Sequence, residues 1–261
     1  MAAAFFNRLA EPSRAVAFSA GTQPAAHVHP EVVTVMRELG IGLDSAVPRR
    51  LTGELARDAQ WLVTMGCGEE CPVVPGVKRE DWSLPDPQGQ GLEAVRAIRD
   101  QVRAHVEAFA RRERLAAPAT IVEAGRQDIP EILAFLAANG LPAAGLAEYV
   151  TDLLVAREGG HLVGTAALEV YGREALLRSV AVAGTLRGTG LGQRLTRAAL
   201  ALARRRDVAR LFLLTETAAA FFPRFGFADI ERSLVPESIR QTVEFASACP
   251  ASARVMVTEL S

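Results

Sequence analysis

The chain has 261 residues, of which 49% are hydrophobic and 23% charged, and its formal net charge is −1. This length and composition predict a globular protein of one large domain or two ordinary ones, and a charge near zero argues against nucleic acid or a membrane surface as a partner. No apolar run approaches the roughly 18 residues of a membrane span, and the first ten residues lack the basic start of a signal peptide, so we expect a cytoplasmic protein.

Apolar patterns in the first half predict two strands and a long helix. The runs AVAFSA at 15–20 and WLVTM at 61–65 have the composition of strands. From 91 to 113, apolar residues recur at spacings of three and four, which is the period of an amphipathic helix. Basic residues gather at the end of this segment, as they do at helix C-termini.

We expect a domain boundary directly after this helix. Pro118 prevents the helix from continuing easily, and a strand-like run begins at Thr120. The boundary is therefore predicted near 116–119, between a first domain at 1–115 and a second at 119–261.

The second half alternates short strands with helices. Strand patterns occur at 120–123, 152–157, 161–170, 174–182, 210–214 and 254–258, and helical patterns at 191–205 and 218–225. The sequence Glu158-Gly159-Gly160 predicts a hairpin turn between the second and third of these strands. Successive strands with a helical crossover inserted among them predict an α/β fold whose sheet is of mixed direction.

A glycine-rich turn separates the strand that ends at Val182 from the next helix, in the segment SVAVAGTLRGTGLGQRL. A Walker loop would need a lysine here, and a dinucleotide fingerprint would need Gly-x-Gly-x-x-Gly with a later acidic residue. The six residues RGTGLG at 187–192 instead fit Arg/Gln-x-x-Gly-x-Gly/Ala. Its glycines let the backbone approach a ligand, and the amides at the helix start can bind a pyrophosphate. The alternative is a plain turn, although three glycines and an arginine within six residues exceed what a turn requires.

The order of strand, glycine turn, helix, strand and a short helix ending in Gly226-Phe227 resembles the GNAT acetyltransferases over roughly 119–261. The resemblance implies acetyl-CoA as the co-substrate. It implies that the pantetheine arm pairs with the backbone of Val180, Ala181 and Val182. It also implies that the pyrophosphate is held by the turn and the helix start, at Arg187, Gly188, Thr189, Gly190, Leu191, Gly192 and Gln193.

Three separated segments resemble, more narrowly, the acetyltransferases of arsenic-resistance clusters. They are LLRSVAV, LLTETAAAFFPRFGF and SLVPESIRQTVEFASACPASA. This resemblance implies an N-acetyltransferase that acts on a small, anionic or arsenic-related amine.

Acetyl transfer to an amine needs a base for the amine and a proton for the departing thiolate. Many family members supply that proton from the tyrosine of Tyr-x-x-x-Gly-Phe. Phe222 stands in its place here. Either water protonates the thiolate, or Phe222 only packs against the cofactor. As the base we favour Glu216, with Glu169 and Glu174 as rivals. Each of the three can instead be a solvated strand-end charge.

Arg178 is a charge within the apolar strand LLRSVAV. Because an unpaired buried arginine would be costly, its side chain must face either a partner or an anionic substrate. We treat it as a candidate active-site residue.

Two cysteines of the first half, Cys67 and Cys71, follow the WLVTM run. No further ligands accompany them at matching spacing, so we expect no metal site. A redox role and a structural role in a tight loop remain equally open for them. The third cysteine, Cys249, is expected to be an ordinary small buried residue.

Four segments of the first half resemble the arsenate reductases that have the low-molecular-weight tyrosine phosphatase fold, over residues 1–113. They are GTQPAAHVHPEVVTVMRELGI, LTGELA, VTMGCGEECP and EDWSLPDPQGQGLEAVRAIRDQV. The likeness implies a flavodoxin-like domain, a thiol reductant as partner and Asp86 as general acid. A plain Pro-Asp-Pro turn is the alternative at Asp86.

Proteins of that family begin with a strand and a Cys-x5-Arg loop whose thiolate attacks arsenate. This chain begins with MAAAFFNRLAEPSR, which corresponds to the helix that follows that loop in the family. Neither Cys67 nor Cys71 lies in such a pattern, so we expect the reductase half to be inactive as written. An empty central position in its sheet would leave ladder groups unpaired. We therefore expect the true start to lie upstream of Met1, or else a degenerate domain kept as a scaffold.

The sequence as a whole predicts an α/β protein in which a GNAT mixed-sheet domain follows an incomplete flavodoxin-like domain. Three alternatives remain. The natural protein is a working arsenate reductase if it carries the upstream loop. In the second alternative, the second half is a non-catalytic coenzyme A-binding module, which the loss of tyrosine at Phe222 permits. In the third alternative, the first half is a platform that binds a partner protein.

Overall fold

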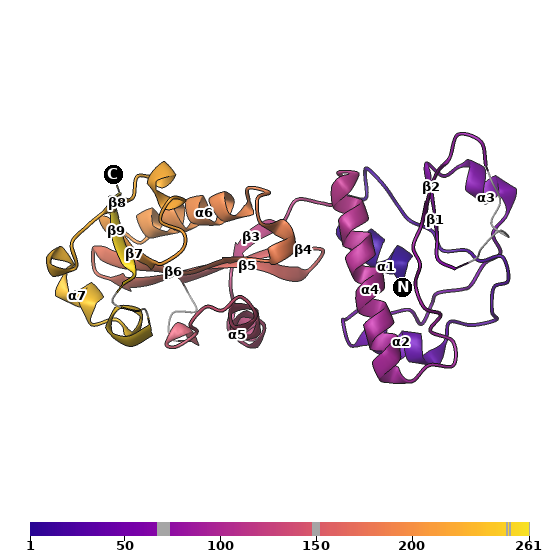
Figure 1. The fold of residues 1–261 in the computed structure, drawn as a ribbon, viewed down its shortest axis with the longest axis horizontal. Helices are drawn as coiled ribbons and strands as arrows, with labels where there is room; N and C mark the ends of the chain where they lie inside the picture. Colours follow the sequence, from indigo (N-terminus) through magenta and orange to yellow (C-terminus); the bar gives the residue numbers. More distant parts are fainter. Residues whose placement is uncertain (67–73, 148–151, 249, 251, 261) are drawn as a thin grey trace. The chain divides into compact units, whose positions relative to one another are not determined.

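The structure is a computed structural model that describes residues 1–261 except 67–73, 148–151, 249, 251 and 261 (Figure 1). The chain forms two compact units, unit 1 at Met1–Ala117 and unit 2 at Pro118–Ser261. Within the described ranges, no helix is both long enough and apolar enough to cross a membrane.

Unit 1 packs short helices against one long helix. Its elements are α1 (Ala2–Leu9), α2 (Pro30–Arg37), α3 (Gly53–Arg57), β1 (Trp61–Thr64), β2 (Lys78–Asp81) and α4 (Leu92–Arg112). The apolar face that the sequence predicts for α4 is buried against α1 and α2, with Val95, Val102 and Phe109 in the core. β1 and β2 are parallel and pair from Trp61 with Lys78 to Thr64 with Asp81.

The predicted strand AVAFSA at 15–20 is wrong. The segment has no regular structure, and Val16 and Phe18 are 56% and 66% exposed. Its backbone is held by a side chain of α1 instead: the Ala17 N–H donates to Asn7 Oδ1 at 2.6 Å, and Asn7 Nδ2 donates to the Ala17 carbonyl at 2.9 Å. A strand needs a partner strand for its ladder, and the part of unit 1 that the structure describes pairs β1 with β2 only.

Unit 2 is a seven-stranded sheet in the order β3-β4-β5-β6-β7-β9-β8. Its strands are β3 (Thr120–Glu123), β4 (Leu153–Glu158), β5 (His161–Tyr171), β6 (Glu174–Val182), β7 (Arg210–Thr215), β8 (Ala228–Asp229) and β9 (Arg254–Glu259), and its helices are α5 (Ile129–Ala138), α6 (Leu191–Arg205) and α7 (Glu237–Arg240). Only the pair β6–β7 is parallel, because α6 forms a crossover between these two strands. The predicted mixed sheet and the hairpin turn between β4 and β5 are confirmed.

Helices cover both faces of this sheet (Figure 1). On one face α6 buries its apolar side, including Leu195 and Leu202, against strand residues such as Leu168 and Leu177. On the other face α5 and α7 pack against separate apolar clusters. The helix predicted at 218–225 is shorter than expected: a turn leads into a single 3₁₀ turn, Phe222–Phe225, because Pro223 lies inside the segment.

A β-bulge bends β6 near the middle of the sheet. Thr165 of β5 faces Ala181, but Ala167 faces Arg178, so one β5 residue lies opposite two residues of β6. Ser179, in the bulge, has a φ of +53°, in the left-handed region that few non-glycine residues adopt.

The pairing of β6 with β7 ends just before the bulge. Leu177 with Leu213 is the last pair, although β6 continues to Val182 and β7 to Thr215. On its β7 side, the second half of β6 is therefore left without a strand partner among the described residues.

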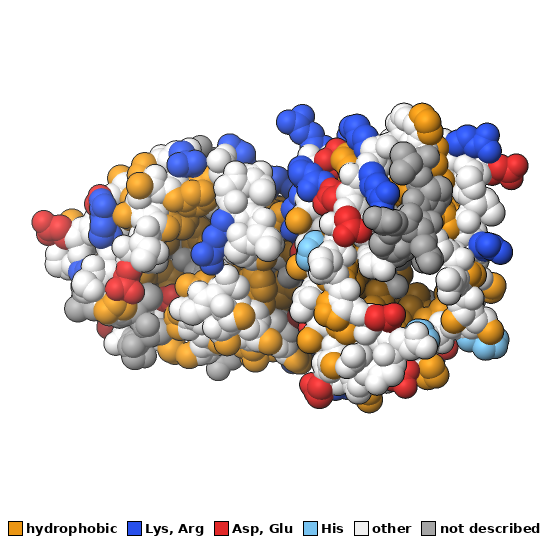
Figure 2. Space-filling model, turned by 45° about the vertical axis from the view of Figure 1, so that its right-hand side comes forward, with side chains coloured by type: hydrophobic (Ala, Val, Ile, Leu, Met, Phe, Trp, Pro, Cys, Tyr) orange, Lys and Arg blue, Asp and Glu red, His pale blue; other side chains and the backbone are white. Residues whose placement is uncertain are grey.

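Charged side chains of both signs are interspersed over the face of the molecule shown in Figure 2. Ion pairs between such side chains occur in both units, such as Arg96 with Glu38 at 2.6 Å and Arg205 with Glu123 at 2.7 Å. Exposed pairs of this kind stabilise a fold little, since water screens them. They leave no broad surface of a single sign on that face.

Candidate functional site

The glycine turn of unit 2 ends at an uncapped helix N-terminus. Gly188 and Gly190 have φ values of +81° and +90°, and Gly190 is the N-cap of α6. No side chain caps the helix, and its first turn carries no acidic residue. The first amides of α6 lack intrahelical partners and lie at the positive end of the helix dipole, so they are available to an anion.

The other predicted residues of this segment lie close by. Arg187 donates from Nε to the Val182 carbonyl at 3.3 Å and from Nη2 to Asn139 Oδ1 at 3.1 Å, which fixes its guanidinium beside the strand end. A Cβ added to Gly192 would lie 3.6 Å from the ring of Phe221 and 3.7 Å from Val182. The structure thus brings the end of β6, residues 187–190 and the start of α6 together.

A buried ion cluster lies where β6 stops pairing with β7. Arg178, the first β6 residue beyond the last pair, donates to the carboxylate of Glu169 on β5 and forms an ion pair with Glu244 at 2.8 Å. The Tyr171 hydroxyl donates to the second oxygen of Glu169 at 3.0 Å. The structure therefore gives Arg178 two carboxylate partners, and its place in the active site stays a prediction.

The carboxylates that the sequence proposes as bases occupy three different environments. Glu216 is exposed, just after β7. Glu174 lies at the start of β6, remote from the bulge, where it pairs with Arg210 and accepts from the Ser238 hydroxyl at 2.7 Å. Glu169 is enclosed in the ion cluster. Glu244, which the sequence analysis missed, joins that cluster from the C-terminal segment.

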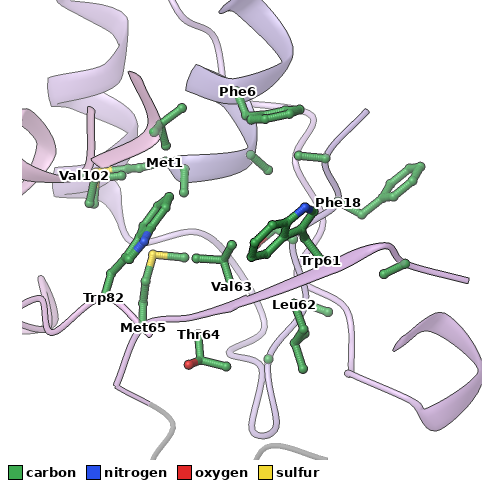
Figure 3. Close-up of a pocket in the computed structure, with 18 of the residues that line it drawn as sticks. Met1, Phe6, Phe18, Trp61, Leu62, Val63, Thr64, Met65, Trp82 and Val102 are labelled. Carbon is green, nitrogen blue, oxygen red and sulfur yellow. The ribbon is translucent and has the colours of Figure 1, made fainter. Parts of the chain in front are cut away.

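Unit 1 contains a groove of about 1480 Å³ with both apolar and polar side chains in its lining. Figure 3 shows side chains that line it, among them Trp61 and Val63 of β1, Phe6 of α1, Val102 of α4, and Trp82. The amino group of Met1 lies at this groove, and burial lowers its pKa below the ordinary value. Burial therefore disfavours the charged form of this amino group.

The residues predicted to act in the first half are only partly described. Asp86 lines the same groove and is exposed, and its Oδ1 accepts from the Gln88 N–H at 2.9 Å, as in an Asx turn. Its role as a general acid stays a prediction. Cys67 and Cys71, the redox candidates, and Cys249 lie outside the described residues. Among the residues that are described, no group of three or more metal-binding side chains occurs.

Two family models match the chain, one in each half. Residues 150–229 match the acetyltransferase (GNAT) domain, and residues 1–120 match the low molecular weight phosphotyrosine protein phosphatase. The chain joins a phosphatase-type domain to a GNAT acetyltransferase domain. The resemblance of the second half to the GNAT acetyltransferases and the low-molecular-weight phosphatase fold expected for the first half are thereby confirmed.

Curated relatives of the phosphatase-type domain carry the names of arsenate reductases. A candidate arsenate reductase of Halobacterium salinarum is 42% identical over 86 residues, which are 33% of this chain and 61% of that protein. The glutaredoxin arsenate reductase of Synechocystis is 35% identical over 86 residues, or 32% of this chain and 66% of that protein. The chain thus spans less than two thirds of the length of these relatives.

Solved structures similar to the chain include two proteins that were crystallised with coenzyme A. The Rv2747 protein of Mycobacterium tuberculosis, crystallised with CoA and NLQ, is 26% identical and covers 54% of this chain and 99% of its own, with a TM-score of 0.48. The N-acetylglutamate synthase of Neisseria gonorrhoeae is 20% identical and covers 80% of this chain and 58% of its own, also with a TM-score of 0.48.

In the GNAT domain, Phe222 is a core residue. It is 6% exposed and packs between Phe221 and Phe227, with ring centroids 5.1 Å and 5.7 Å away. That Phe222 also packs against the cofactor stays a prediction. Phe221 is the aromatic side chain that lies against Gly192 at the start of α6.

Proposed function

We propose that the GNAT domain transfers the acetyl group of acetyl-CoA to the nitrogen of a small amine. The observation that carries this proposal is the uncapped start of α6, preceded by two left-handed glycines and placed beside the unpaired edge of β6. In this proposal, the amides of residues 188–193 bind the pyrophosphate and Arg187 adds charge-assisted hydrogen bonds. The backbone of residues 180–182 pairs with the pantetheine arm along the edge that β7 leaves free.

The reaction needs few groups besides this cradle. The amine nitrogen attacks the thioester carbon, a C–N bond forms, and the C–S bond breaks to release the thiolate. The nitrogen gives its proton to a base, for which Glu216 stays the proposed residue. Phe222 has no proton to give, so water protonates the thiolate in this scheme. Holding the thioester in the gap between β6 and β7 supplies proximity and orientation, which are large effects in acyl transfer.

The acceptor is proposed to be a small amine that is anionic or related to arsenic. Two observations support this class: the resemblance of three segments to arsenic-resistance acetyltransferases, and the arsenate reductase names among the relatives of the other half. A panel of amines that includes phosphinic and arsenic amino acids, with thiol release from acetyl-CoA as readout, tests the proposal. Turnover with one acceptor class supports it. Tight binding of acetyl-CoA without turnover of any amine would instead indicate a coenzyme A-binding module.

Phe221 and Phe222 form a matched pair for testing the cofactor site. Phe221→Leu removes the ring that lies against Gly192, so we expect KM for acetyl-CoA to rise several-fold. Phe222→Leu is expected to lower the free energy of unfolding by about 1 kcal/mol through looser core packing, with KM within twofold of the wild-type value. Steady-state kinetics and urea unfolding measure both effects. A larger KM change in Phe222→Leu would mean that Phe222, and not Phe221, touches the cofactor.

We propose arsenate reduction as a second candidate function, for a longer polypeptide in which a strand and a thiolate loop precede Met1. The match of residues 1–120 to the phosphatase family and the arsenate reductase names among the relatives of this half support it. Arsenate-dependent oxidation of a thiol reductant by such a polypeptide is the expected result. If the longer polypeptide binds arsenate no better than the 261-residue chain, this second function is refuted.

A further inference from the structure

Two exposed arginines of unit 2 have no acidic partner. Elsewhere in this unit arginines form ion pairs with carboxylates, as Arg157 does with Asp128 at 2.7 Å. Arg197 on α6 and Arg224 in the 3₁₀ turn Phe222–Phe225 are both exposed, and within the described part of the chain neither forms an ion pair with an Asp or Glu side chain. Their charges are therefore available to an anionic ligand.

Each of these guanidinium groups lies over an aromatic ring. The guanidinium carbon of Arg224 is 5.1 Å from the ring centroid of Phe221, and that of Arg197 is 5.8 Å from the ring centroid of Phe225. The two rings are neighbours, with centroids 5.3 Å apart. Because a cation is attracted to the face of a ring, these contacts restrict both long side chains to one region. We call these four residues, Arg197, Phe221, Arg224 and Phe225, the arginine–phenylalanine cluster.

The cluster adjoins the start of α6. The Phe221 ring is its link to the glycine turn, since a Cβ added to Gly192 would lie 3.6 Å from that ring. Arg197 follows on the same helix, six residues after Leu191, which places its backbone about 9 Å further along the helix axis. Two unpaired positive charges thus lie near the amides that are proposed to bind a pyrophosphate.

Coenzyme A carries a second anionic group close to its pyrophosphate. The pyrophosphate joins the pantetheine arm to the 5′ carbon of a ribose, and the 3′ oxygen of that ribose bears a phosphate monoester. Such a monoester has a charge of about −1.5 to −2 at pH 7. Only a few bonds separate it from the pyrophosphate, so a pyrophosphate at the start of α6 places the 3′-phosphate within reach of side chains that adjoin this helix end.

We propose that Arg197 and Arg224 bind the 3′-phosphate of acetyl-CoA and so determine which acyl carrier the GNAT domain accepts. This inference rests on the acetyl transfer proposed above. Guanidinium groups bind phosphate through paired charge-assisted hydrogen bonds, and they can do so while stacked on a ring. A carrier that has the same pantetheine thioester but no 3′-phosphate offers the two arginines no partner. The arginines contact a part of the carrier that does not react, so they affect binding and not the chemical step.

A comparison of acetyl-CoA with 3′-dephospho-acetyl-CoA tests the proposal, because the two ligands differ only in the phosphate. In calorimetric titrations of the 261-residue chain, we expect the wild type to bind acetyl-CoA about tenfold more tightly. Two exposed charge-assisted contacts give an effect of about this size. In the double variant Arg197→Gln with Arg224→Gln, affinity for acetyl-CoA should fall to that for the dephospho ligand, and kcat at saturating acetyl-CoA should stay within twofold.

Arg173→Gln is the matched control. Arg173 is also exposed and forms no ion pair with a carboxylate in the described structure, but it directly precedes β6, whereas the glycine turn follows the other end of that strand. Its variant should keep the tenfold preference. Because both ligands are titrated into the same sample, a loss of folded protein does not change the ratio of the two affinities.

Three results would overturn the proposal. They are equal affinity of the wild type for the two ligands, a tenfold preference that persists in the double variant, and a preference that is lost equally in Arg173→Gln. These results leave acetyl transfer untouched as long as acetyl-CoA binds. A wild-type chain that binds neither ligand refutes the proposed function itself, and the role of the two arginines with it.

Discussion

Gly190→Val is expected to reduce the affinity of the GNAT domain for acetyl-CoA by about 100-fold or more. Gly190 has a φ of +90° and is the N-cap of α6, so it sets the direction of the amides proposed to bind the pyrophosphate. A β-branched residue is strained in this region by about 1–3 kcal/mol. Valine would therefore force the turn into another conformation and rotate those amides away from the ligand. Calorimetric titration with acetyl-CoA measures the loss.

Gly172→Val is the control for the strain itself. Gly172 also has a positive φ, +63°, in the turn between β5 and β6, and like Gly190 it has open space around the position of a Cβ. This variant should lose stability but keep acetyl-CoA affinity within about threefold. Equal affinity in the two glycine variants would show that the turn before α6 does not hold the pyrophosphate.

Arg178→Met is expected to lower the free energy of unfolding by about 3–5 kcal/mol, because the change leaves the carboxylates of Glu169 and Glu244 buried without their guanidinium. Such a loss is a large part of the roughly 5–15 kcal/mol that stabilises a typical domain. Urea unfolding followed by circular dichroism measures the loss. The fluorescence of Trp61 and Trp82, which both lie in unit 1, follows that unit separately.

Arg254→Met provides the comparison with an exposed pair. Arg254 and Asp229 form an ion pair whose side chains are 55% and 54% exposed, and exposed pairs contribute about 1 kcal/mol or less. A loss in Arg178→Met no greater than that in Arg254→Met would mean that water or a rearranged side chain compensates the buried carboxylates.

Local sequence was sufficient for the features that neighbouring residues determine. The helices α4 and α6 follow from apolar residues repeated at the helical period, and the hairpin between β4 and β5 from two consecutive glycines. The proposed pyrophosphate loop could be recognised for the same reason. Its strand end, glycines and helix start follow one another directly in the chain, so they are also neighbours in the folded domain.

Pairing between distant segments could not be predicted in this way. The run at 15–20 has the composition of a strand, but a strand forms only where a partner lies alongside, and the side chain of Asn7 takes the backbone groups of Ala17 instead. The helix expected at 218–225 contracts to one 3₁₀ turn for a local reason, because Pro223 lies inside the segment.

The amino-acid sequence by itself determined the two families, the mixed sheet and the loop proposed to hold acetyl-CoA, because these depend on local periodicity and on motifs of adjacent residues. Only the tertiary structure decided the surroundings of Arg178. Its partners come from β5 and from a π-helical turn far along the chain, and no local pattern marks Glu244 as a neighbour of β6. A buried charge must be neutralised by whichever segments the fold brings beside it, and that choice is made by the packing of the whole domain.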